Sequence, residues 1–136
     1  MNLSLSDPTL LQTQAYIGGT WVDADDGATF PVSNPANGEL LVRVAKVGAT
    51  ETRRAIEAAS LAMEGWKAQP AKHRAGVLRK WFDLMLENQE DLATIMTAEQ
   101  GKILAESRGE VAYGASFIEW FGEEAKRIDG DVIPGP

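Results

Sequence analysis

The stretch between residues 88 and 127 places the tightest constraint on how this chain can fold. Its apolar residues recur at helical spacing on both sides of Gly101, and glycine commonly ends helices by adopting a left-handed backbone. The pattern therefore predicts one helix over 88–100 and a long final helix over 102–127. The final helix carries an apolar stripe that includes small residues, namely Val111, Ala115, Ile118, Gly122 and Ala125.

Two further helices are expected before this pair. Thr50 is placed to cap the first, whose apolar residues recur at helical spacing as far as Trp66, with an expected stop at Gly65. Pro70 is expected to open the second, because proline is favoured in the first turn of a helix. Apolar residues cover more than one face of this second helix, so it is predicted to be largely buried. They are Val77, Leu78, Trp81, Phe82, Leu84 and Met85.

The residues before Gly48 indicate strands instead. Apolar residues surround Gly18-Gly19, which indicates a short strand with a turn or bulge. Two more strands are expected over 29–32 and 39–47, on either side of Asn37-Gly38, a dipeptide that favours hairpins.

The organisation that follows is one domain of an α+β, mostly helical fold. A short N-terminal β-meander over 15–47 is followed by four helices over 50–128. Residues 1–14 are expected to lie loosely on the surface.

Composition narrows the classes of function. The formal net charge of −7 argues against nucleic acids and anionic membranes, which attract clustered Lys and Arg. No apolar run is long enough to span a bilayer, and the first residues lack the pattern of a secretory signal, so we expect a cytoplasmic protein. The 136 residues contain no cysteine, which excludes disulfides, thiolate nucleophiles and cysteine-ligated zinc within them.

Several motifs could carry chemistry, but each has a simpler interpretation that we favour. Gly18-Gly19 and Gly101-Lys102 lack the spacing of a phosphate-binding loop and are interpreted as turn or cap glycines. His73 is interpreted as an exposed structural residue rather than a general base. Five glutamates of the last helix are interpreted as a solvated acidic face rather than a metal site, because no Glu-x-x-His pattern accompanies them. They are Glu106, Glu110, Glu119, Glu123 and Glu124.

An aromatic group on the last helix leaves two interpretations open. Tyr113, Phe117 and Trp120 share one helical face, and Phe121 borders it. Such a stripe belongs to a core more often than to a ligand pocket. The residues alone thus show no catalytic, cofactor-binding or metal-binding constellation.

Several segments together resemble the aldehyde dehydrogenase family over most of the chain, from about residue 14 to residue 134. They are YIGGTWV, the SNPANGE turn, GATETRRAIEAA, RAGVLRKWFDLMLENQEDLATIMTAEQGK and YGASFIEWFGEEAKRIDGDVIP. The last of these is similar to the succinate-semialdehyde branch, and relatives acting on glutarate semialdehyde share much of it.

The resemblance implies a parent enzyme that oxidises succinate semialdehyde to succinate through a cysteine thioester, with NAD or NADP as hydride acceptor. The family's catalytic and cofactor-binding residues lie outside the matching region, so this chain alone is expected to be inactive and to bind no cofactor. The parent is expected to be a homo-oligomer, and the isolated chain to form a dimer. The alternative is a stand-alone helical interaction module without a dehydrogenase role.

The resemblance also implies two sites within the chain. The helix with Tyr113, Phe117 and Trp120 resembles the one that lines the aldehyde entry tunnel. Glu99, with the backbone of Val32 and Ser33, resembles a monovalent-cation site of some relatives, although those relatives have Asp where this chain has the longer Glu.

Overall fold

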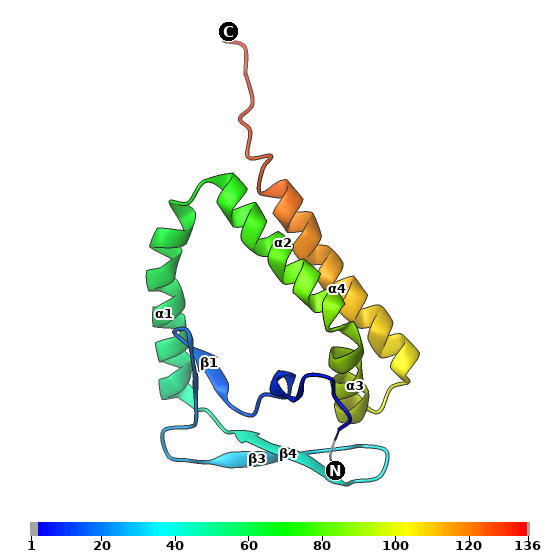
Figure 1. Cartoon of the computed structure of the whole chain (residues 1–136). Helices are drawn as coiled ribbons and strands as arrows, with labels where there is room; N and C mark the ends of the chain where they lie inside the picture. The colour runs from blue at the N-terminus through cyan, green and yellow to red at the C-terminus, as the bar shows by residue number, and fades with distance from the viewer. Residues whose placement is uncertain (1–2, 136) are drawn as a thin grey trace.

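The computed structural model describes residues 3–135. Its four helices follow two small antiparallel sheets (Figure 1), so the expected helix-rich α+β fold is confirmed. In chain order the elements are the 3-10 helix η1 (Pro8–Leu10), β1 (Ala15–Ile17), β2 (Thr20–Val22), β3 (Thr29–Ser33), β4 (Leu40–Ala45), α1 (Ala49–Lys67), α2 (Ala71–Glu87), α3 (Gln89–Gln100) and α4 (Leu104–Glu124).

The strands form two separate hairpins rather than one continuous sheet. β1 pairs with β2 across Gly18-Gly19, whose φ angles of 60° and 88° suit a two-residue turn with left-handed backbone at both positions. β3 pairs with β4 across a longer loop, in which the Gly38 N–H donates to the Asn34 carbonyl oxygen at 2.7 Å. The Asn-Gly dipeptide therefore shapes a loop over 34–39 instead of forming a two-residue turn.

Local signals place several helix ends correctly. α2 begins directly after Pro70, and α3 ends at Gly101, whose φ of 74° is left-handed. The start of α1 differs, because its cap is Gly48 and not Thr50. Glu51 accepts a hydrogen bond from the Gly48 N–H at 2.9 Å, which satisfies a donor that the helix itself leaves unpaired.

The expected stop at Gly65 is wrong, because α1 continues through this residue to Lys67. An interior glycine costs a helix only about 1 kcal/mol, which weakens the helix without ending it. α1 ends shortly before Pro70, since the residue preceding a proline disfavours helical backbone.

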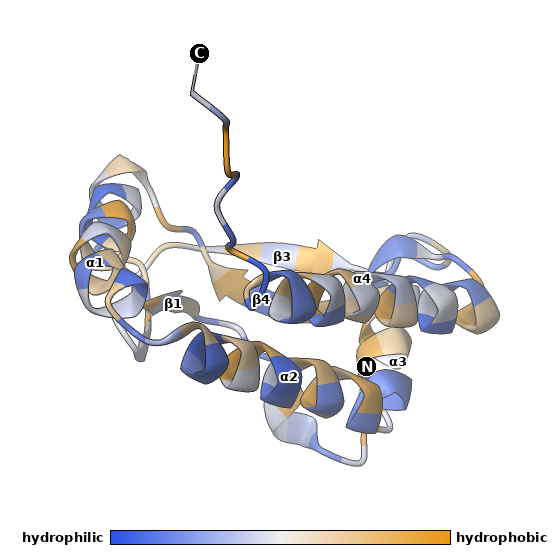
Figure 2. Cartoon of the chain, turned by 90° about the horizontal axis from the view of Figure 1, so that it is seen from above, coloured by the Kyte–Doolittle hydropathy of each residue, from blue (hydrophilic) through white to orange (hydrophobic). Residues whose placement is uncertain are grey.

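The core lies where α4 packs against α2 and α3. Figures 1 and 2 both show α2 and α4 side by side, while α1 stands apart from them. A Cβ atom at Gly122 would lie 3.4 Å from the Cβ of Leu78, so the absence of a side chain lets the two helices approach closely. Val111 and Ala115 are buried, which confirms that the apolar stripe of α4 faces the core.

The expectation that α2 is largely buried is wrong for this chain. Val77, Trp81 and Leu84 are 45%, 55% and 45% exposed, because α4 covers only one side of α2. The accessible surface is 9613 Å², whereas a compact protein of the same mass would expose about 6,900 Å². Although this exposed surface is partly apolar, no helix within residues 3–135 is long and apolar enough to cross a membrane.

The N-terminal segment is held more firmly than expected. The backbone N–H groups of Ser6 and Asp7 donate to the two carboxylate oxygens of Asp91 at 2.9 and 2.7 Å. Asp91 is buried in the first turn of α3, and the Ala45 N–H donates to the Thr13 carbonyl oxygen at 2.8 Å. Of the segment 1–14 that was expected to be loose, residues 1 and 2 lie outside the described residues, and these bonds tie Ser6, Asp7 and Thr13 to α3 and β4.

Candidate functional site

The candidate site is the outward side of α4, formed by Tyr113, Phe117 and Trp120 and called here the aromatic face. Spacings of four and three residues place the three side chains together, opposite the buried residues Val111 and Ala115. They are 67%, 48% and 62% exposed. The rings of Tyr113 and Phe117 meet edge to face, with centroids 4.9 Å apart. The aromatic face is therefore not part of the core that residues 3–135 form.

An open hollow of about 630 Å³ adjoins the aromatic face at the C-terminal half of α4. Phe117 and Trp120 line it with Phe121, whereas Tyr113 lies outside its lining. The rest of the lining is polar or charged and consists of Ser116, Glu119, Glu123, Glu124 and Arg127. The hollow thus joins an aromatic wall to a charged rim.

Four of the five acidic side chains of α4 are paired with cations, and Glu106 is the exception among the described residues. Oε1 of Glu119 lies 3.0 Å from Nη1 of Arg79 in α2, and Oε2 of Glu123 lies 2.7 Å from Nζ of Lys126. The Lys126 ammonium is the main cause that holds the pKa of Glu123 below its ordinary value. Two further pairs join Glu110 to Lys102 and Glu124 to Arg127. Within residues 3–135 no group of three His, Asp or Glu side chains is placed to hold a metal ion.

The cation-site candidate combines two segments that lie close together at one point. Glu99 is exposed in the last turn of α3, and Val32 and Ser33 end β3. A Cβ at Gly101 would lie 2.8 Å from Cγ of Pro35, so the loop after β3 touches the end of α3. No hydrogen bond joins Glu99 to the β3 backbone in the described part of the chain.

The remaining sequence candidates lie outside α4, the helix that carries the aromatic face. His73 is exposed in the first turn of α2. Gly18-Gly19 forms the β1–β2 turn and Gly101 ends α3, so the interpretation as turn and cap glycines is confirmed.

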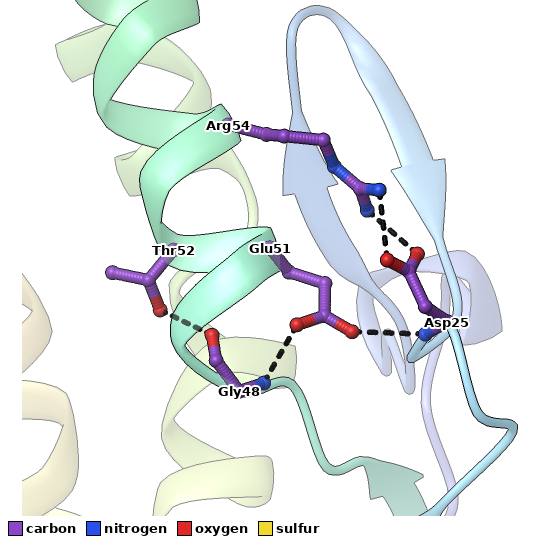
Figure 3. A network of polar contacts seen from close by, with 5 residues as sticks. All are labelled: Asp25, Gly48, Glu51, Thr52 and Arg54. Atoms are coloured by element: carbon purple, nitrogen blue, oxygen red, sulfur yellow. Dashed lines mark hydrogen bonds and ion pairs between the residues drawn. The ribbon is translucent and has the colours of Figure 1, made fainter.

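A polar network at the start of α1 is a feature that sequence reasoning missed (Figure 3). The Glu51 side chain is buried and accepts from the backbone N–H groups of Asp25 and Gly48, each at 2.9 Å. The bond from Asp25 is the main cause that lowers the pKa of Glu51. Arg54 then pairs with both carboxylate oxygens of Asp25 at 2.9 and 2.8 Å. The network ties the β2–β3 loop to α1, and the three-residue spacing of Gly48 and Glu51 was its only local signal.

Comparison with known proteins places the chain in a family. The aldehyde dehydrogenase family matches residues 21–136. Over 133 residues the chain is 63% identical to a glutarate-semialdehyde dehydrogenase of Pseudomonas aeruginosa and 57% identical to the NADP⁺ succinate-semialdehyde dehydrogenase of Escherichia coli K12. Each alignment covers 98% of this chain but only 28% of the relative.

Solved structures agree with this assignment. An aldehyde dehydrogenase from Brucella melitensis biovar abortus 2308 has a TM-score of 0.96 at 55% identity, and a succinate-semialdehyde dehydrogenase from Burkholderia pseudomallei has a TM-score of 0.94 at 60% identity. These matches cover 99% and 98% of this chain and 28% of each solved chain. The chain therefore belongs to the aldehyde dehydrogenase family and corresponds to the N-terminal region of its enzymes.

Proposed function

We propose that this chain is the N-terminal segment of an NAD(P)-dependent succinate-semialdehyde dehydrogenase. The identity to enzymes that act on succinate and glutarate semialdehyde supports this substrate class, an aldehyde with a carboxylate at its other end. Glutarate semialdehyde, which is one carbon longer, is the nearest alternative substrate. We further propose that the parent enzyme is a cytoplasmic homo-oligomer.

The role we propose for this chain is to supply one wall of the tunnel through which the aldehyde enters. The observation that carries this proposal is the aromatic face, because Tyr113, Phe117 and Trp120 are exposed on a helix whose other side is fixed in the core. Rigid aromatic side chains lose little conformational entropy when they contact a ligand, and they exclude water from an apolar carbon chain. The wall would orient the aldehyde without taking part in bond making.

The chemistry itself would reside in the rest of the parent enzyme. The 136 residues contain no thiol that could form the thioester, so this chain alone is proposed to be inactive. It is also proposed to bind no dinucleotide, because its glycines lack the spacing of a phosphate-binding loop. When bound elsewhere in the parent, NAD or NADP would accept the hydride. Glu99, with the backbone of Val32 and Ser33, is proposed as a monovalent-cation site beside the loop that contacts Gly101.

A chimeric enzyme tests this proposal. This chain would replace the matching N-terminal region of the Pseudomonas aeruginosa relative, to which it is 63% identical. We expect the chimera to reduce NAD⁺ or NADP⁺ with succinate or glutarate semialdehyde, and this chain alone to give no signal above buffer. A folded chimera without activity, or turnover by pure isolated chain, would overturn the proposal.

The second candidate is a stand-alone helical interaction module, which the exposed apolar side of α2 favours. Such a module would need no further catalytic residues and would bind a partner through that surface. The genomic reading frame separates the two candidates, since only the dehydrogenase requires a cysteine-containing continuation.

A further inference from the structure

Arg74 of α2 carries a donor that the described chain leaves unused. Its Nε atom is buried and has no hydrogen-bond partner among residues 3–135, and no acidic side chain in that range pairs with its guanidinium. Buried polar groups without partners are rare in native proteins, because each loses its bonds to water and gains nothing in return. The missing acceptor therefore calls for an explanation.

The position of Arg74 shows where the acceptor must come from. Arg74 lies one helical turn before Leu78, which packs on Gly122 of α4, so the Arg74 side chain leaves α2 next to that packed side. Val77 and Trp81 come three and seven residues after Arg74, so they lie beside it on the adjoining side of α2, where they are half exposed. An element that covered the exposed side would pass next to the guanidinium.

Local charge indicates the chemistry of that element. Residues 70–82 contain Lys72, Arg74, Arg79 and Lys80 but no acidic residue, although the whole chain has a net charge of −7. Arg79 is already paired with Asp83 of α2 and with Glu119 of α4. Arginine presents a planar fork that matches a carboxylate with two parallel hydrogen bonds, so an Asp or Glu side chain is the acceptor that best fits Arg74.

The amount of uncovered surface agrees with a large partner. The chain exposes about 2,700 Å² more than a compact protein of its mass, which is the scale of an obligate interface. The relatives are also much longer, since the alignment covers only 28% of each. Both observations indicate that the exposed side of α2 is covered by the polypeptide that follows this region in the relatives.

We propose that Arg74 is a docking anchor, which binds an Asp or Glu side chain from the part of the aldehyde dehydrogenase fold that follows these residues, while Val77 and Trp81 pack beneath it. This proposal rests on the function proposed above. It assigns to Arg74 a positioning role, because the ion pair would hold α2, and through α2 the core contact of α4, against the remainder of the enzyme.

The experiment compares one substitution in two settings. Arg74→Met would be made in the isolated 136-residue chain and in the chimera with the Pseudomonas aeruginosa relative, and the unfolding equilibrium constant would be measured by urea titration. In the isolated chain, at a concentration where it is monomeric, Arg74→Met removes an unpaired buried donor, so the unfolding constant should stay the same or fall. In the chimera it strands a carboxylate, so the constant should rise by about a hundredfold.

A control and a second measurement make the result specific. Arg53→Met removes an exposed arginine of α1 and should leave both constants within about twofold, as surface substitutions usually do. In the second measurement, each Asp and Glu in the rest of the chimera is replaced in turn, with and without Arg74→Met. One of these replacements should raise the unfolding constant when Arg74 is present but not when Arg74 has already been replaced. Equal effects of Arg74→Met in the two settings, or no acidic residue that couples to Arg74, would overturn the proposal. An inactive wild-type chimera would instead overturn the proposed function, so the two failures are distinguishable.

Discussion

Replacing Gly101 with alanine should destabilise this chain more than the same replacement at Gly38, although both glycines have a φ of 74°. At either position alanine must adopt a left-handed backbone, which costs about 1–2 kcal/mol. A Cβ at Gly101 would also lie 2.8 Å from Cγ of Pro35, whereas a Cβ at Gly38 would meet no atom within 4 Å. Because the proline ring is rigid, this overlap should add about 1–3 kcal/mol.

The substitution Pro35→Ala separates the two costs. It removes Cγ, and the proline Cβ lies 3.8 Å from the position of the new Gly101 Cβ, which is ordinary contact. In the Pro35→Ala background the cost of Gly101→Ala should therefore fall to about 1–2 kcal/mol, the value expected at Gly38. Free energies of unfolding from urea titrations, followed by tryptophan fluorescence, give all of these differences. Equal losses at Gly101 and Gly38 in the otherwise unchanged chain would refute the reasoning.

Three further predictions concern the aromatic face, the α1 network and the exposed surface. In the chimera, Trp120→Ala should lower kcat/KM for the aldehyde and leave KM for the dinucleotide unchanged. Steady-state kinetics and thermal melting are measured together, because unchanged kinetics with a lower melting temperature would show that Trp120 is a core residue. Glu51→Gln should destabilise the isolated chain at neutral pH. Because the folded-state pKa of Glu51 is lowered, the stability that its carboxylate contributes is complete above about pH 4.5 and is lost as the pH falls through the folded-state value, so the two proteins should converge in acid when unfolding is followed against pH. The isolated chain should dimerise with rising concentration through its uncovered α2 and α4 surface, and light scattering that shows only monomer at high concentration would argue against this.

The features that sequence predicted well depend on neighbours in the chain. The apolar stripe of α4 follows from helical spacing, and the end of α3 follows from the backbone freedom of Gly101. The aromatic face was also visible as a helical stripe. Its exposure was not, since periodicity shows which side chains lie together but not what covers them.

The features that sequence missed depend on contacts between distant residues. Asp91 binds backbone groups 84 and 85 residues away, and Glu51 binds the backbone of Asp25 across 26 residues. No local pattern marks such a carboxylate as a partner for a loop. The burial of α2 was overestimated for a related reason. Its apolar residues cover more than one face of the helix, but the rest of the described chain packs against only one side of it.

The intact mass of the natural gene product tests the central claim most directly. If this chain is the N-terminal wall of an aldehyde dehydrogenase, the native polypeptide should be several times heavier than 14.7 kDa, and its sequence should continue into a region that contains a cysteine. A native product of 14.7 kDa that consists of these 136 residues alone would contradict the account and favour the interaction module.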